Sequence, residues 1–243
     1  MRFFFSSKTV ETDLSALDCD MHSHLLPGID DGAPDPAASI SLVSGLQSLG
    51  LQRFITTPHV IRDLYPNNDA SIEAAQESLV AAGGPRLKAA AEYMMDDHFS
   101  RLLHEKAALR CISGNYVLVE FSFVAMPFDW KEIFFNLQVQ GYQPILAHPE
   151  RYTYLAAQKQ VFAEIISLGV LLQLNLNSLT GYYGKQPAEL AAHLVKQKLI
   201  SFLGTDCHHQ RHIDALRNGK HLMPALNQLL DSGKILNPTL ASA

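Results

Sequence analysis

The strongest constraint on the fold is a regular alternation of short apolar runs with longer segments of helical periodicity. Most of the apolar runs are almost wholly apolar or β-branched, as in Val117-Leu118-Val119. Such runs are typical of parallel strands that are covered on both faces. The predicted strands are residues 16–23, 53–57, 87–94, 116–121, 143–147, 170–176 and 199–205.

The segments between these strands carry apolar side chains three to four residues apart, which predicts amphipathic helices. The predicted helices are residues 35–49, 68–82, 127–140, 159–168 and 187–197. Seven β/α units in one chain favour an α/β fold with a closed or nearly closed parallel barrel. A doubly wound open sheet is the alternative, but the chain has neither of the usual glycine-rich nucleotide loops.

Composition excludes several other classes of protein. The 243 residues are 47% apolar and 18% charged, as expected for one globular domain. The formal net charge of −5 does not indicate a nucleic-acid-binding surface. No apolar run is long enough to span a bilayer, and the N-terminal run is too short for a signal peptide. Three widely spaced cysteines without a CxxC pair suit a reducing cytoplasm, where we expect this protein.

A metal-binding type of side chain stands at the end of six of the seven predicted strands. In a parallel barrel these ends meet at one rim, where the active sites of such folds lie. His22 and His24 are two positions apart in an extended segment, so both point to the same face, and Asp206 and His208 repeat this spacing. With Asp31 from the loop after the first strand, the candidate ligands are His22, His24, Asp31, His59, Glu92, Glu120, His148, Asp206 and His208.

Each of these residues alone also has an ordinary explanation, since a strand-end glutamate can form a salt bridge and a histidine can belong to the core. The chain has only 24 Asp and Glu residues and 11 His, so their repeated position at strand ends favours a shared site. Nine ligands exceed the needs of one ion and suit three ions with at least one bridging carboxylate. Neighbouring divalent ions of this kind are typical of phosphoryl transfer.

The ordered motifs around these residues resemble the PHP (polymerase and histidinol phosphatase) superfamily. Within it they resemble the CpsB/CapC-type manganese-dependent bacterial protein-tyrosine phosphatases of capsule and exopolysaccharide operons. The matching motifs are DMHSHLLPGIDDGA (20–33), TTPH (56–59), AEYMMDD (91–97), VEFS (119–122), LAHPERY (146–152), LQLNLNSLTGYYG (172–184) and GTDCHH (204–209). The resemblance implies a PHP-type distorted (β/α)7 barrel formed by the whole chain, 1–243, with the motifs within about 16–210.

The resemblance also implies how the ligands are shared among three ions. His22, His24, Glu92 and Asp206 would hold the first, with Glu92 bridging to a second. Zinc-type PHP relatives tend to have histidine where this chain has Asp31 and Glu120, and carboxylates favour Mn²⁺ or Fe over Zn²⁺, with Co²⁺ and Mg²⁺ as further alternatives. The remaining ligands are Glu120 and His148 for the second ion, and Asp31, His59 and His208 for the third.

Two arginines are candidate phosphate ligands. Arg151 matches its motif, His-Pro-Glu-Arg, whereas family members in Gram-positive operons carry a further arginine a few residues beyond the Asp-x-His motif. The nearby candidate here is Arg211, which lies closer to His208 than expected and could equally be a solvated loop charge. Tyr182 and Tyr183, in a glycine-flanked loop, are candidate walls for a phenyl ring.

The resemblance implies hydrolysis of phosphotyrosine on a protein, with the tail of a bacterial tyrosine kinase as the expected partner. A cysteine phosphatase needs an arginine six residues after its nucleophile, and none of the three cysteines has one. A small-molecule phosphomonoesterase of the histidinol-phosphate type and a non-catalytic metal-binding regulator of the kinase are the alternatives. Self-association of the chain is left open.

Overall fold

Short parallel strands form the inner layer of the fold. The structure, a computed structural model, describes residues 11–240. Every ladder between its named strands is parallel, as predicted from the apolar runs. The strands are β1 (Cys19–Asp20), β2 (Arg53–Thr56), β3 (His59–Val60), β4 (Lys88–Ala89), β5 (Glu92–Met94), β6 (Tyr116–Glu120), β7 (Gln143–Leu146), β8 (Leu171–Asn175) and β9 (Phe202–Gly204).

These strands form two sheets, with the orders β1-β2-β4 and β3-β5-β6-β7-β8-β9. The prediction of one continuous strand over residues 87–94 is wrong, because β4 pairs with β2 and β5 pairs with β3. The break follows the neighbouring strand, where Pro58 separates β2 from β3 and has no N–H to donate. Two hydrogen bonds cross the break, from Ala90 N to Thr56 O and from Glu92 N to Pro58 O.

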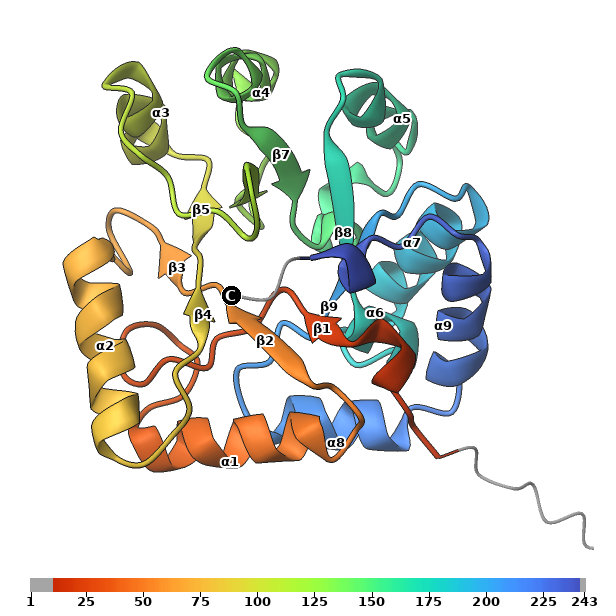
Figure 1. Cartoon of the computed structure of the whole chain (residues 1–243). Helices are drawn as coiled ribbons and strands as arrows, with labels where there is room; N and C mark the ends of the chain where they lie inside the picture. Colours follow the sequence, from red (N-terminus) through yellow and green to blue (C-terminus); the bar gives the residue numbers. More distant parts are fainter. Residues whose placement is uncertain (1–10, 241–243) are drawn as a thin grey trace, which may run out of the picture.

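Backbone contacts between the first and last strands close the curled sheet into a barrel. Ser23 and Cys207 form an isolated parallel bridge. Asp206 N donates to His22 O over 2.8 Å, and His24 N donates to Cys207 O over 3.0 Å. With β2 and β3 counted as one interrupted strand, and β4 and β5 as another, the barrel has the seven predicted positions (Figure 1).

Helices cover the outside of this sheet (Figure 1). The five predicted helices are present, with shifts of one to three residues at their ends; Asp35 caps the first, and Asn68 with Ser71 forms a capping box on the second. Four others were not predicted, namely α3, α6, α8 and α9. The helices are α1 (Pro36–Gln47), α2 (Asp69–Ala81), α3 (Asp97–His104), α4 (Trp130–Val139), α5 (Gln160–Ser167), α6 (Leu176–Thr180), α7 (Lys185–Lys196), α8 (Gln210–Asn218) and α9 (Leu222–Asp231).

Several predicted strands are shorter in the structure, the last being Phe202–Gly204 rather than 199–205, and two of the differences coincide with a change of backbone conformation. The first strand was expected from residue 16, but Ser15–Leu17 forms a 3-10 turn and Asp18 has a φ of 62°, so β1 starts at Cys19. The sixth was expected to include Leu176, where α6 begins instead. Both differences shorten the strands and leave their C-terminal ends at the same rim.

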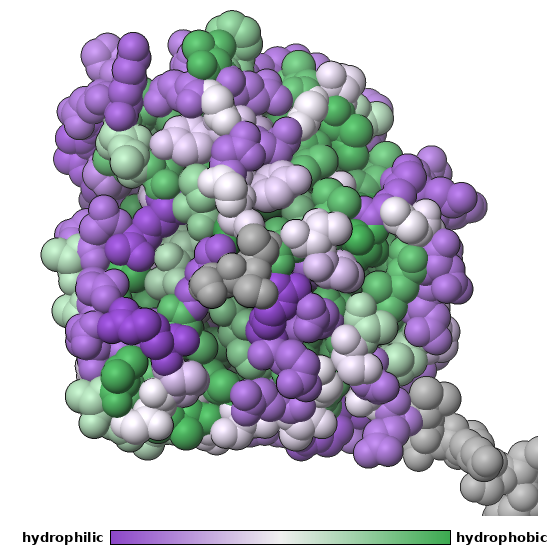
Figure 2. Space-filling model, in the orientation of Figure 1, coloured by the Kyte–Doolittle hydropathy of each residue, from purple (hydrophilic) through white to green (hydrophobic). Residues whose placement is uncertain are grey.

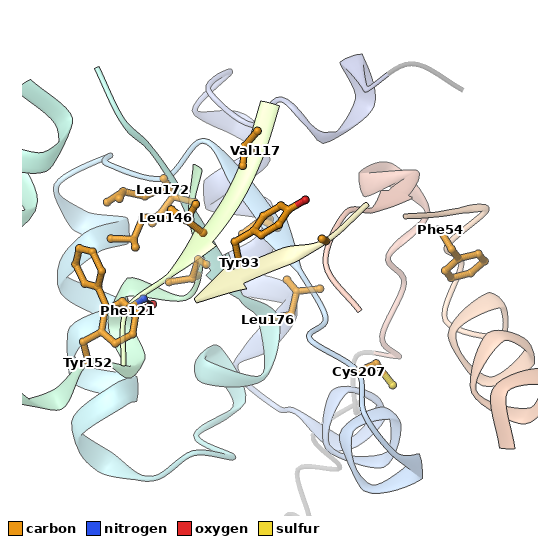
Figure 3. Packing of buried hydrophobic residues seen from close by; sticks show 14 of the residues in the cluster. Phe54, Tyr93, Val117, Phe121, Leu146, Tyr152, Leu172, Leu176 and Cys207 are labelled. Carbon is orange, nitrogen blue, oxygen red and sulfur yellow. Dashed lines mark hydrogen bonds between the residues drawn. The ribbon is translucent and has the colours of Figure 1, made fainter. Parts of the chain in front are cut away.

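The core lies on both faces of the sheet, as expected for a barrel surrounded by helices. Along β6, Val117 and Val119 belong to the larger buried cluster, while Leu118 belongs to a smaller one. Leu146 and Leu172, which are partners in neighbouring strands, lie together in the larger cluster (Figure 3). The rim that carries the polar strand ends is therefore supported by buried apolar side chains on both faces of the strands.

On the face drawn in Figure 2, hydrophilic residues are interspersed with apolar patches. Among the helices within residues 11–240, none combines the length and the apolar character that crossing a membrane requires.

Candidate metal and phosphate site

All nine predicted ligands meet at the C-terminal rim of the strands. Their candidate ligand atoms fall into four overlapping groups, and within each group the atoms lie within 4.8 Å of one another. Seven of the nine residues are buried, while His208 is half-buried and Asp31 is exposed. The groups are His24-Asp31-His59-His208, His22-His148-Asp206, His22-His24-Glu92 and His59-Glu92-Glu120.

Glu92 lies at the centre of the site and is fully buried. Its Oε2 atom is 3.1 Å from His22 Nε2, 3.4 Å from His24 Nε2 and 3.2 Å from His59 Nδ1. Its other oxygen, Oε1, is 2.9 Å from His148 Nε2. Because the two oxygens face different histidines, this carboxylate has the position that a bridging ligand needs.

The remaining carboxylates extend the site in two directions. Asp206 Oδ1 lies 3.4 Å from His22 Nε2 and 3.3 Å from His24 Nε2. Nearer the solvent, Asp31 Oδ1 lies 3.4 Å from His208 Nε2. His24 is therefore within reach of both the first and the third of the ligand sets that the resemblance implies.

Unpartnered buried atoms indicate that these residues fit divalent ions. Within residues 11–240, His59 Nδ1, both carboxylate oxygens of Glu120 and Asp206 Oδ1 are buried and accept or donate no hydrogen bond. Leaving such atoms without a hydrogen-bond partner costs free energy. Two of them, His59 Nδ1 and Glu120 Oε1, lie only 3.0 Å apart. Imidazole nitrogens and carboxylate oxygens facing one another without hydrogen bonds are the donor set of Mn²⁺, Fe or Zn²⁺.

Outer hydrogen bonds orient three of the histidines. His22 Nδ1 lies 2.8 Å from Gln173 Oε1, and His24 Nδ1 lies 2.8 Å from Asp30 Oδ2. His208 Nδ1 lies 2.9 Å from the backbone oxygen of Asp206. Each partner accepts a hydrogen bond, so each Nδ1 carries the proton and each Nε2 is free to bind a metal.

Sequence reasoning missed Asp30 and Gln173. Asp30 was read only as the neighbour of Asp31, and its adjacency to an expected ligand gave no sign of which carboxylate would turn toward His24. Gln173 did carry a signal, because an amide in the middle of the apolar run Leu171-Leu172-Gln173-Leu174 is unusual for a strand buried on both faces.

The charges within the site stabilise one another. Burial alone would raise the pKa of Glu92 and of Asp206, but the surrounding histidines hold both well below their usual range. Burial lowers the pKa of His22, and the charges of Glu92 and Asp206 outweigh this effect and raise it to about 9. Divalent ions would take the place of these imidazole protons, so metal binding would release protons.

A cavity of about 180 Å³ opens beside the ligands. Arg151 forms one wall: its Nη1 atom donates to Asp206 Oδ2 over 2.7 Å, and its guanidinium lies between the rings of Phe123 and Tyr183, 4.5 Å and 4.4 Å from their centroids. Arg151 thus has a fixed orientation beside the metal ligands, as a phosphate ligand requires. The cavity is lined by Asp31, His59, Phe123, His148, Arg151, Tyr183, Asp206, His208, His209 and His212.

Arg211 and Tyr182 do not line this cavity. Arg211 is exposed in the first turn of α8, and its role as a phosphate ligand stays a prediction. Of the two tyrosines expected as walls, only Tyr183 faces the cavity, while Tyr182 is 39% exposed and packs against His212. His209 and His212 complete the wall next to His208.

The fold and the site together define a parallel α/β barrel with a cluster of candidate metal ligands at the C-terminal ends of its strands. Residues 18–218 match the family model described as capsular polysaccharide synthesis, CpsB/CapC. The chain belongs to the CpsB/CapC family, which confirms the resemblance that the motifs indicated.

Named relatives and a solved structure agree with this assignment. Tyrosine-protein phosphatase YwqE of Bacillus subtilis is 30% identical over 78% of this chain and 76% of its own length. The putative tyrosine-protein phosphatase CapC of Staphylococcus aureus is 28% identical over 78% of this chain and 76% of its own length. A crystal structure from a study of YwqE and Streptococcus pneumoniae CpsB, described as unique metal-dependent tyrosine phosphatases, aligns with a TM-score of 0.75 and 28% identity, covering 91% of this chain and 90% of that one.

Proposed function

We propose that this chain is a metal-dependent protein-tyrosine phosphatase that acts in the bacterial cytoplasm on a tyrosine kinase controlling capsular polysaccharide synthesis. The observation that carries the proposal is the convergence of nine histidine and carboxylate side chains beside a cavity walled by Arg151. YwqE is named a tyrosine-protein phosphatase and CapC a putative one, which supports phosphotyrosine as the substrate.

The site would hold three divalent ions, and Mn²⁺ suits it best because Asp31 and Glu120 add hard oxygen ligands. The ligand residues would be the nine predicted ones, with Glu92 shared between ions and His24 within reach of two of them. When bound, such ions activate water for attack on phosphorus and neutralise negative charge on the phosphoryl oxygens.

The protein's own groups would bind and orient the phosphate ester. Arg151 presents a planar guanidinium to the cavity, where it can donate to phosphoryl oxygens. Asp206, Phe123 and Tyr183 hold that guanidinium from three sides, so little orientational entropy is lost when the ester binds. A tyrosine leaving group, whose pKa is about 10, departs without a strong general acid.

Substrate preference tests this function. Manganese-loaded protein is expected to release phosphate from a phosphotyrosine peptide at least about tenfold faster than from the matching phosphoserine peptide, because the alkoxide of serine is a much poorer leaving group than a phenolate. Phosphate release is measured for both peptides and for histidinol phosphate under the same conditions. Faster release from histidinol phosphate would favour the small-molecule esterase, and no release with bound metal would favour a non-catalytic regulator.

The two candidate arginines are expected to differ strongly. Arg151→Ala removes the guanidinium from the cavity wall and leaves Asp206 Oδ2 with only the hydrogen bond from Asn175 Nδ2, so we expect kcat/KM to fall about 100-fold. Arg211→Ala removes an exposed charge outside the cavity lining and is expected to lower kcat/KM only about two- to fivefold. This effect should become smaller as the ionic strength rises. Steady-state rates at low and high ionic strength measure both. Equal losses for the two variants would show that Arg211 reaches the substrate.

A further inference from the structure

The hydroxyl of Tyr183 is an unexplained feature of the cavity. Its ring lies against Arg151, and its residue lines the cavity, yet the oxygen is buried and has no hydrogen-bond partner within residues 11–240. A buried tyrosine hydroxyl usually finds a partner. The nine metal ligands do not account for this oxygen.

Two glycines and two backbone hydrogen bonds shape the loop that carries Tyr183. Gly181 and Gly184 flank the two tyrosines and adopt φ values of 82° and 94°, which side chains with a Cβ rarely tolerate. Gly184 N donates to Gly181 O over 3.0 Å, and Tyr182 N donates to Asn177 O over 3.2 Å. These features define the course of the backbone on both sides of Tyr183.

A buried carboxylate ties this loop to the segment that carries Arg151. Glu150 Oε1 accepts from the backbone N of Asn175 over 3.0 Å and from Ser178 Oγ over 2.6 Å. Glu150 directly precedes Arg151, and Ser178 lies in α6, directly before the tyrosine loop. Glu150 thus links the segment that carries Arg151 to the helix that precedes Tyr183.

We propose that Tyr183 is a second phosphoryl-binding residue, whose hydroxyl donates a hydrogen bond to a non-bridging oxygen of the phosphate that Arg151 binds. This inference rests on the proposed function, because it assigns a ligand of the same site. Burial raises the pKa of Tyr183, so the hydroxyl keeps its proton and remains a donor at neutral pH. Arg151 and Tyr183, whose ring lies 4.4 Å from the guanidinium, would then contact the same dianion.

Replacing Tyr183 by phenylalanine tests the proposal, since the ring that packs on Arg151 is kept and only the hydroxyl is lost. The matched control is Tyr182→Phe, which removes the hydroxyl of the neighbouring tyrosine outside the cavity. Binding of inorganic phosphate to the manganese-loaded proteins is measured by calorimetry, and KM and kcat are measured with a phosphotyrosine peptide. Thermal unfolding confirms that both variants are folded.

We expect Tyr183→Phe to weaken phosphate binding about tenfold or more, as for a hydrogen bond to a charged group, and to raise KM with little change in kcat. Tyr182→Phe should match the wild type. Unchanged phosphate affinity in Tyr183→Phe, or an equal loss in both variants, would overturn the assignment. If the wild type hydrolyses the peptide and Tyr183→Phe equals it, the proposed function stands and the inference fails. If phosphate binding needs Tyr183 but no ester is hydrolysed, the inference stands and the proposed function fails.

Discussion

Removing the bound metal with a chelator is expected to lower phosphotyrosine hydrolysis by about three orders of magnitude or more, because in the proposed mechanism metal ions supply the activated water. None of the cysteines within the described residues lines the cavity. Burial raises the pKa of all three thiols, that of Cys19 to about 12, so they stay protonated and unreactive. Restoring Mn²⁺ should restore the rate.

Phosphate release before chelation, after chelation and after addition of Mn²⁺, Zn²⁺ or Mg²⁺ measures this effect. The thermal unfolding midpoint is expected to fall by about 5–10 °C on metal removal, since ions that bind only the folded state at about 100 times their Kd stabilise it by about 2.7 kcal/mol. Loss of activity well below the new midpoint excludes unfolding as the cause. Protein shown to be metal-free by elemental analysis that keeps most of its rate would contradict the proposed mechanism.

The convergence of the nine candidate metal ligands could be predicted from sequence because the topology leaves little freedom at a strand end. Once the runs ending at Glu120 and His148 are parallel neighbours, their last side chains must reach the same rim. The prediction needed only the order of the strands and no knowledge of their exact ends. For the same reason, the division of residues 87–94 between two sheets did not displace Glu92, the first residue of β5.

The residues that sequence reasoning missed act through geometry that residue types do not encode. Which of Asp30 and Asp31 turns toward His24 depends on the conformation of the loop that follows β1. The side-chain oxygen of Asp30 also accepts from Gly32 N over 2.9 Å, and a Cβ at Gly32 would lie 2.2 Å from the backbone oxygen of His24. Only glycine fits there, so the turn that positions Asp30 was visible only after folding.

One of the missed helices, α8, has a largely polar first turn. The first turn of α8 follows directly on the Asp-x-His motif, and its sequence, Gln210-Arg211-His212-Ile213, reads as a polar loop. In the structure His212 and Ile213 are buried, which turns the preceding Arg211 outward. The candidate arginine was therefore identified by its distance along the chain from His208, whereas its direction depended on an unpredicted helix.

Replacing Glu92 by glutamine is expected to lower kcat on phosphotyrosine peptides on the order of 10³-fold while leaving the barrel folded. The two carboxylate oxygens face different histidines, Oε2 toward His22 and His59, and Oε1 toward His148. An amide keeps the shape but has one oxygen and no negative charge, and its nitrogen cannot bind a metal. The variant would therefore lose the carboxylate that we propose is shared between two ions.

Steady-state rates, bound metal per chain and the unfolding midpoint together measure this change. Glu164→Gln is the matched control, because Glu164 is exposed, pairs with Lys131 on the surface and should change stability by less than about 1 kcal/mol. We expect Glu92→Gln to retain fewer ions per chain than either the wild type or this control. A Glu92→Gln protein with the full metal content and the wild-type rate would show that no ion depends on Glu92, and that the metals are held by separate sets of ligands.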